Sequence, residues 1–273
     1  MLTKTRRLVP VLLAGLLLVP VTGTVSATEP DPFVPVPDAV LAQAELDLVT
    51  LTNSKRTARG LVKLRIDPDL MAIARDRAEV MAENDIMSHT EPNGQKVFDR
   101  IRAAGLTWYG AGEIIAWNNY PMEYSAPEAI RAWMASPSHQ AIMISTGYNY
   151  VGYGAAESAT GKLYYAGLFV KEPDETGARA NFRTISKQRV SAAKVRVTIR
   201  WKGADTTLQV LTAGLRYFEV QRRRVGGTWH SWGTTTATSR SVTWLRAYDR
   251  EVRVRARDRA GNWGTWRIIR IDL

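Results

Sequence analysis

Histidines are the natural starting point for chemistry in this chain, because its 273 residues include no cysteine. Without cysteine there is no thiol nucleophile, no thiolate metal ligand and no disulfide. The histidines are His89, His139 and His230. An imidazole can ligate a metal or exchange protons near neutral pH. By spacing alone, histidines so far apart are more often structural groups with satisfied hydrogen bonds.

One carboxylate stands out beside the histidines. Glu113 is flanked by small and apolar residues in the segment 110–116, which reads GAGEIIA. A carboxylate in such surroundings is expected to have a partner, because burial disfavours its charged form. Glu113 lies 24 residues after His89 and 26 before His139, and these spacings carry no metal signal by themselves.

Periodic apolar residues predict the helices that would position these groups. A helix is expected from Asp38 to about Gly60, with apolar residues at 3-4-3 spacing. A second is capped by Asp67, with Pro68 in its first turn, and its mostly apolar face includes Arg77. A shorter helix follows and ends at Gly105.

Two further helix starts and two strands complete this region. The pairs Ser125/Pro127 and Ser136/Pro137 each combine a capping residue with a nearby proline, as at helix N-termini. The strand-like runs are residues 148–156 and 163–170. Helices come first and strands last, so the predicted fold class is α+β.

Several segments, in order, resemble bacterial domains of the CAP superfamily, the SCP-like or cysteine-rich secretory family. The three main ones are Ser88–Gly94, Gly110–Ala116 and Trp133–Ile144. Three shorter ones are residues 51–56, 67–70 and 98–100. The resemblance covers roughly residues 45–170, and its specificity comes from the shared order rather than from any one segment.

The resemblance implies a three-layer α-β-α sandwich with a cavity where some family members bind a divalent metal, often zinc. By matched position, the cavity residues are His89, His139 and Glu113. Two neutral imidazoles and one carboxylate form a ligand set that leaves a zinc position open for water. Alternatively, the imidazoles hold the metal while Glu113 acts catalytically, orienting and deprotonating a bound water.

The chain also departs from the family pattern. Ile114 stands where the family usually has asparagine, and Gln140 and Ile142 replace the usual arginine and asparagine. Ala166 and Gly167 replace a common Thr-Gln pair. Each change is expected to remove a polar group near the cavity. Such groups orient metal-binding imidazoles, so their loss favours binding over tuned catalysis and would suit a lipid or other small apolar ligand.

The C-terminal part follows a different pattern. Residues 172–189 are polar and read as a linker, and residues 190–273 show the period-two alternation of an antiparallel sandwich. This region resembles a fibronectin type III or immunoglobulin-like module, most clearly at residues 251–262. Where that pattern has a tyrosine, this chain has Arg250, with Tyr248 two residues earlier.

Charge divides the chain between the two regions. Residues 28–182 carry a net charge of −6, and residues 183–273 carry +14. In a module of this kind, one outward face would hold the candidate ligand-binding residues Arg223, Arg253, Arg255 and Arg257. Arginine beside exposed tryptophan can bind an anionic polymer. In the alternative interpretation, the tryptophans fill the core and the arginines coat a solvated sheet.

The N-terminus predicts export. Residues 1–27 have a basic start, an apolar centre and small residues at the end, as in a secretory signal peptide. Residues 28–38 form a proline-rich spacer. No later segment is apolar for long enough to span a membrane, so none is expected in the mature chain. We expect a secreted bacterial protein, extracellular or associated with the cell wall.

These predictions combine into one layout and three hypotheses. The signal peptide and spacer precede a CAP domain at 39–171, the linker at 172–189 and the basic sandwich at 190–273. The preferred hypothesis is a binding protein: its His/Glu cavity holds a divalent metal or small apolar ligand, and the sandwich retains it on an anionic cell-wall polymer or envelope surface. Nucleic acid is not an expected partner. The alternatives are a metal-assisted hydrolase of an envelope polymer or peptide, and a scaffold for a protein partner.

Overall fold

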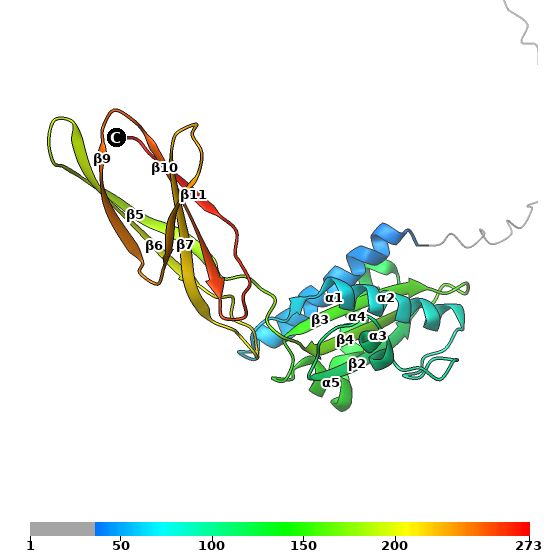
Figure 1. Ribbon diagram of the computed structural model, residues 1–273. Coiled ribbons are helices and arrows are strands. Elements are labelled where there is room, and N and C mark those ends of the chain that lie inside the picture. Colours follow the sequence, from blue (N-terminus) through cyan, green and yellow to red (C-terminus); the bar gives the residue numbers. More distant parts are fainter. Residues whose placement is uncertain (1–35) are drawn as a thin grey trace, which may run out of the picture. The chain divides into compact units, whose positions relative to one another are not determined.

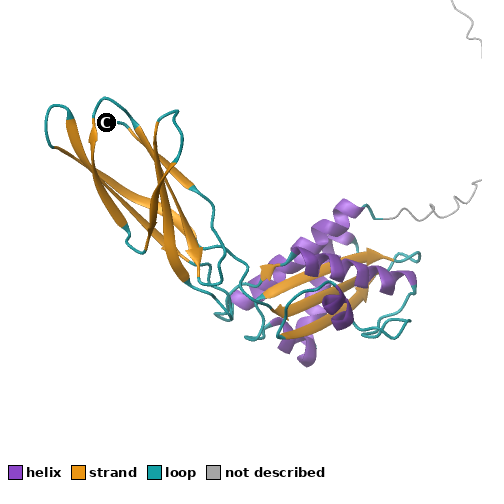
Figure 2. Cartoon of the chain, viewed as in Figure 1, coloured by secondary structure: helices purple, strands orange, loops and turns teal. Residues whose placement is uncertain are grey.

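The computed structural model describes residues 36–273, so the predicted signal peptide and nearly all of the spacer lie outside the described residues. Every helix in the described part precedes residue 144, and only strands follow Lys171 (Figure 2). None of these helices has the length and apolar character that crossing a bilayer requires.

The N-terminal region builds one mixed sheet with helices around it. Its helices are α1 (Asp38–Thr57), α2 (Pro68–Glu83), α3 (Val97–Ala103), α4 (Met122–Ala135) and α5 (Pro137–Met143). Its strands are β1 (Arg65–Ile66), β2 (Gly110–Asn118), β3 (Tyr150–Glu157) and β4 (Leu163–Lys171). They are ordered β1-β3-β4-β2, with β1 parallel to β3 and the other pairs antiparallel.

Helices cover both faces of this sheet and give three layers (Figure 1). On one face, Leu48 of α1 and Trp133 of α4 pack with Tyr153 of β3. On the other face, α2 packs on β3 and β4, and Met81 of α2 and Ile101 of α3 lie in the same buried cluster. This is the α-β-α arrangement that the resemblance implied. Strand β2 lies at one edge of the sheet, so groups from both helical layers can meet beside it.

Helix starts agree with the sequence at α2 and differ at α4. The Asp67 carboxylate accepts hydrogen bonds from Asp69 N at 2.7 Å and Leu70 N at 3.0 Å, which confirms the predicted cap. Helix α4 begins at Met122 rather than near Ser125, because Pro121 O already accepts from two backbone N–H groups of the first turn. Pro127 therefore lies inside the helix.

The C-terminal region is all β. Its strands are β5 (Arg179–Arg189), β6 (Lys194–Ala204), β7 (Leu215–Arg224), β8 (His230–Thr235), β9 (Ser239–Leu245), β10 (Arg250–Asp258) and β11 (Arg267–Ile271). They form two antiparallel sheets, β11-β10-β7-β8 and β5-β6-β9. The finer assignment to the fibronectin type III class stays a prediction.

The predicted linker is partly wrong. Residues 179–189, expected to lie in it, form strand β5 and pair along their length with β6. Their polar composition did not predict a strand, because most of the strand is exposed. Ala180 is its one buried residue among those described. The predicted alternation elsewhere is confirmed: Val197, Val220 and Val254 are fully buried in one core between the sheets.

Candidate functional site

Three elements bring the predicted site residues toward one another. His89 lies in the loop after α2, Glu113 in edge strand β2 and His139 in α5. One Glu113 oxygen, Oε2, lies 2.6 Å from His89 Nδ1. Burial, and after it the nearby His89, lowers the pKa of His139. The structure thus places His89 in contact with Glu113 and makes His139 an electrostatic neighbour of His89.

Glu113 also has a partner that the sequence did not predict. The residue is only 6% exposed, and its second oxygen, Oε1, accepts from Arg77 Nε at 3.0 Å. Arg77 is fully buried on α2. It was visible in the sequence as an arginine on an otherwise apolar helix face, and such a residue must find a buried anion.

Arg77 also ties the histidine loop to α2. Its Nη2 donates to the backbone oxygen of Ser88, next to His89. Its Nε lies 4.0 Å from the Glu91 carboxylate, which in turn accepts from Arg100 Nε at 2.6 Å. Within the described residues, Arg77 Nη1 is buried without a hydrogen-bond partner. The loop carrying His89 is therefore fixed from inside by buried charges.

The contact with Glu113 determines which nitrogen His89 can offer. A carboxylate accepts hydrogen bonds, so Nδ1 carries the proton in the neutral ring and Nε2 is the basic nitrogen. The His89 side chain is 54% exposed, so Nε2 can reach solvent or a ligand. An imidazole held in this way by a carboxylate has a fixed tautomer and a fixed direction.

The sequence left two roles open for Glu113, as a metal ligand or as a group acting beside two ligating imidazoles, and the geometry fits the second. Both Glu113 oxygens are engaged, by Arg77 and by His89, so Glu113 is better placed to orient a ligand than to be one. Two imidazoles remain, His89 and His139, and imidazole suits zinc. Among residues 36–273, the trio does not form a group with ligand atoms all within 4.8 Å of one another.

One group of three carboxylates does meet that distance: Asp174, Asp205 and Asp258. Backbone N–H groups already satisfy them. Gly261 N donates to Asp258 at 2.6 Å, Ala213 N to Asp174 at 2.9 Å, and Gly214 N to Asp205. These bonds hold the loops at one end of the sandwich and account for the cluster without an ion.

The departures from the family pattern are not all near the site. Ile114 is fully buried and packs with the α1 and α4 cluster, on the face of β2 opposite to Glu113. Ile142 packs on the same face: a Cβ added at Gly112, two residues before Ile114, would meet its Cγ2 at 3.2 Å. Gln140 donates to Met134 O at 3.0 Å. The change at Ile114 therefore alters core packing, not the surroundings of the histidines.

The four predicted ligand-binding arginines occupy one face of β7 and β10, interleaved with tryptophans. Arg253 lies between Trp229 and Trp266, at 4.4 Å from each ring centroid. Arg255 lies between Trp266 at 4.5 Å and Trp263 at 4.0 Å. The row is completed by Arg223 over Trp229 and Arg257 over Trp263.

Hydrogen bonds within the sheet engage these same arginines. Arg223 pairs with Glu251 at 2.5 Å, and Arg255 pairs with Glu219 at 2.7 Å. Arg253 donates to the side-chain oxygen of Gln221. An anionic ligand on this face would have to compete with two carboxylates that are already in place.

Comparison with protein families supports the identity of the N-terminal region. Residues 49–169 match the family model described as CAP, cysteine-rich secretory protein family. Two curated relatives come from Bacillus subtilis (strain 168). The chain is 31% identical over 116 residues to the uncharacterized protein YkwD, covering 42% of this chain and 44% of the relative. It is 29% identical over 128 residues to the uncharacterized membrane protein YlbC, covering 47% and 34%.

Solved structures with some similarity include two bacterial proteins. One is an extracellular protein of Bacillus anthracis containing an SCP domain, with 21% identity, a TM-score of 0.45 and coverage of 51% of this chain and 45% of that one. Another is an outer surface protein of Borrelia burgdorferi, with 22% identity, a TM-score of 0.44 and coverage of 51% and 98%. The chain spans less than half the length of its curated relatives. The family match is confined to residues 49–169, where this chain is similar to the CAP domain of the cysteine-rich secretory protein family.

Proposed function

We propose that this protein works at the bacterial cell surface as a binding protein whose CAP domain takes a divalent metal through His89 and His139. The observation that carries the proposal is the 2.6 Å contact between Glu113 and His89 Nδ1. It directs the basic Nε2 of a half-exposed imidazole outward, with His139 nearby. A carboxylate that holds a ligating imidazole is a recurrent partner in metal sites.

The chain's own residues define what this site can do. Glu113 fixes the tautomer of His89, and Arg77 balances the charge of Glu113. The lowered pKa of His139 keeps that ring neutral at neutral pH, as a metal ligand must be. Bound zinc would supply a Lewis acid with positions open to water or ligand. Because Arg77 adds a buried positive charge, we expect metal affinity below that of sites with three protein ligands.

The alternative occupant, a small apolar ligand, has less support. It depended on the loss of polar groups around the cavity, and Ile114 belongs to the core on the other face of β2. Ile142 and Tyr148 lie beside Gly112, which shares that face with Ile114. The donor set, with two imidazoles and an oriented proton, is better suited to a metal than to an aliphatic chain.

Zinc binding by the mature chain, residues 28–273, tests the proposal. We expect near-stoichiometric zinc after equilibrium dialysis at micromolar zinc, lost in the double variant His89→Ala, His139→Ala. The variant His230→Ala is the matched control and should keep its zinc, because this histidine is an exposed residue of strand β8. Equal zinc in the double variant, or none in the wild type, would contradict the proposal.

A metal-assisted hydrolase is the second candidate, with one change of role. Glu113 is held on both oxygens, so the group suited to accept a proton is His89 Nε2, with Glu113 orienting it. On envelope peptides and polymers, His89→Ala should then abolish turnover, and Glu113→Gln should reduce it and change its pH profile. Activity that survives His89→Ala would exclude this candidate.

Retention at the envelope is the second part of the proposal. The region 183–273 carries +14, and we propose that it binds an anionic wall polymer. Because Arg223 and Arg255 are paired with carboxylates, the surface contact should depend more on unpaired cations. The exposed residues Arg196, Arg200 and Lys202 of strand β6 have no ion pair in the described structure and are candidates.

A further inference from the structure

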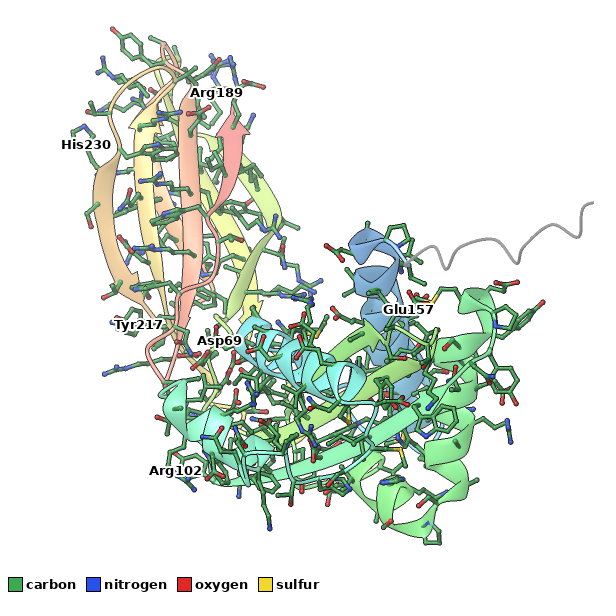
Figure 3. The ribbon with its side chains drawn as sticks, turned by 90° about the vertical axis from the view of Figure 1, so that its right-hand side faces the viewer. Asp69, Arg102, Glu157, Arg189, Tyr217 and His230 are labelled. Atoms are coloured by element: carbon green, nitrogen blue, oxygen red, sulfur yellow. The ribbon has the colours of Figure 1, made fainter. Side chains whose placement is uncertain are left out.

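One end of the C-terminal sandwich holds a pocket of 320 Å³ with an unusual charge. It is lined by Arg222, Arg223, Arg224, His230, Trp244 and Arg250. In Figure 3, Arg189 and His230 lie toward this end of the sandwich, and Tyr217, near the start of β7, lies toward the other. The lining, all within the described residues, includes no carboxylate.

Three of these arginines stand where core residues would be expected. Strand alternation places Arg222 and Arg224 on the same face of β7 as the buried Val220, and Arg250 on the same face of β10 as the buried Val252. That face is the one that packs against the other sheet. The three guanidinium groups therefore line the opening between the sheets rather than the outer face occupied by Arg253 and its neighbours.

These three charges are close together and uncompensated. Arg250 pairs directly opposite Arg224 in the register, a like-charged pair that is unfavourable in a sheet. Burial, followed by the charges of Arg224 and Arg222, lowers the pKa of Arg250. Within residues 36–273, none of the three has an ion pair or a side-chain hydrogen bond, whereas Arg223 next to them has Glu251.

Arg250 is the clearest sign that a ligand is expected. The residue is only 9% exposed, and its Nη1 is buried without a hydrogen-bond partner in the described structure. An unpaired buried charge is strongly unfavourable, and native proteins rarely keep one without a role.

Aromatic contacts hold these side chains in place but do not use their donors. The Arg224 guanidinium lies 4.1 Å from the Tyr248 ring centroid, and that of Arg222 lies 5.0 Å from Trp232. Arg250 lies 5.8 Å from Trp244. Such contacts engage the flat face of the guanidinium, while its N–H groups point outward from its edge. The edges are thus oriented and available for an acceptor.

We propose that this pocket binds a phosphate group, carried by a phosphodiester or phosphomonoester of a surface polymer or lipid headgroup. Three guanidinium groups match an anion with several oxygens and more than one charge, and arginine binds phosphate oxygens in bidentate fashion. The pocket volume lies at the small end of the range for ligand sites, which fits a phosphate with a polyol or sugar attached. The site is independent of metal binding at His89.

Phosphate binding by the mature full-length chain tests the pocket. The probe is inorganic phosphate, titrated calorimetrically at constant ionic strength set with sodium chloride. We expect Arg250→Gln and Arg224→Gln each to weaken binding about tenfold or more, because each removes charge-assisted hydrogen bonds. Arg183→Gln removes an exposed charge from strand β5 of the other sheet and should leave binding unchanged.

Thermal unfolding gives a second readout. Without phosphate, Arg250→Gln should raise the melting temperature, because it removes an unpaired buried charge; phosphate should stabilise the wild type and not this variant. If Arg250→Gln does not fold, Arg224→Gln decides, since Arg224 is exposed. The proposal is overturned if chloride at equal ionic strength has the same effect as phosphate, or if the pocket variants bind like Arg183→Gln.

Two further probes distinguish the source of the phosphate. Glycerol 1-phosphate that binds more tightly than inorganic phosphate, with no binding to phosphatidylglycerol vesicles, indicates a polymer unit. Vesicle binding that is lost in Arg250→Gln indicates a lipid headgroup. The proposal of a phosphate-binding pocket is overturned if vesicle binding is unchanged in Arg250→Gln and Arg224→Gln and neither inorganic phosphate nor glycerol 1-phosphate binds.

Discussion

The Glu113 carboxylate is held from two sides, and this explains how a buried charge can remain next to an exposed imidazole. Arg77 Nε lies 3.0 Å from one oxygen and His89 Nδ1 lies 2.6 Å from the other. Removing one partner of such a pair leaves an uncompensated charge, which costs more than the pair contributes. At this scale, the site is a charge network rather than three isolated ligands.

Glu113→Gln should therefore reduce both stability and metal affinity. We expect the free energy of unfolding to fall by about 3 kcal/mol, because fully buried Arg77 loses its nearest anion. Zinc affinity should fall by about 10- to 100-fold, since His89 loses the group that orients it. Urea unfolding and zinc dialysis measure the two effects. The control is Glu128→Gln, which removes the exposed ion pair with Arg131 and should change neither the free energy of unfolding nor the zinc affinity. A Glu113→Gln protein as stable as the wild type would contradict the charge network.

The sequence predicted His89, Glu113 and His139 from their place in matched segments, but it did not predict their mutual geometry. Arg77 lies 36 residues from Glu113, and nothing in the spacing links them. Its position on an apolar helix face indicated burial without naming a partner. The pocket arginines show the same limit: Arg250 was visible as a departure from an expected tyrosine, yet the register that places it opposite Arg224 arises only from folding.

At the scale of elements, helix α2 is central because it packs directly on the sheet and carries Arg77. Strand β3 allows this close packing through two glycines. A Cβ at Gly152 would lie 2.3 Å from the backbone of Leu70, and one at Gly154 would lie 2.1 Å from that of Ala74. No side chain fits at these distances without moving the helix.

Gly154→Ala should consequently shift α2 and weaken the fold. We expect a loss of about 1–3 kcal/mol or more in the free energy of unfolding, as for overpacked cores. Chemical denaturation measures the loss. Gly110→Ala is the control, since a Cβ there meets nothing within 4 Å. Equal midpoints for the two variants would show that the contact between α2 and β3 is looser than described.

The end of strand β4 should make stability depend on pH. Burial, followed by the nearby Asp67, raises the pKa of Glu172 to about 8 from 4.5. The folded chain then binds a proton that the unfolded chain has released between these values, so stability should fall as pH rises from about 5 to 8. Thermal melts across this range should show the slope, and Glu172→Gln should flatten it by stabilising the protein at pH 8. An unchanged slope in that variant would place the effect elsewhere.

Most elements could be predicted from local signals, and the exceptions have physical reasons. Asp67 with Pro68 identified the start of α2 because a cap satisfies N–H groups locally. Strand β2 was not predicted as a strand, since its glycine-rich start and continuous apolar run have no period-two pattern. The sequence of strand β5 predicts a linker, because its exposed faces carry polar residues.

At the scale of the whole molecule, charge separates the CAP-like region from the basic region that follows. Residues 28–182 carry −6 and residues 183–273 carry +14. Opposite net charges within one chain favour different partners for its two regions. The paired arginines of β7 and β10 show that part of the positive charge serves the sheet itself.

Retention on cell-wall preparations should therefore weaken with salt. The Debye length falls from about 10 Å at 0.1 M to about 3 Å at 1 M ionic strength, so contacts between exposed charges are screened. We expect the bound fraction to fall steeply over this range, as measured by sedimentation with purified walls. Retention unchanged at 1 M sodium chloride would argue against a charge-based contact.

The most direct test of the central claim uses the fact that the chain has three histidines. Nitrogen NMR of the imidazoles in the mature protein reports the protonation of each ring separately. The account predicts that His89 carries its proton on Nδ1, facing Glu113, and that zinc shifts the signals of His89 and His139 while leaving His230 unchanged. A proton on His89 Nε2, or zinc that shifts none of the three or all of them equally, would contradict a metal site built on His89 and His139.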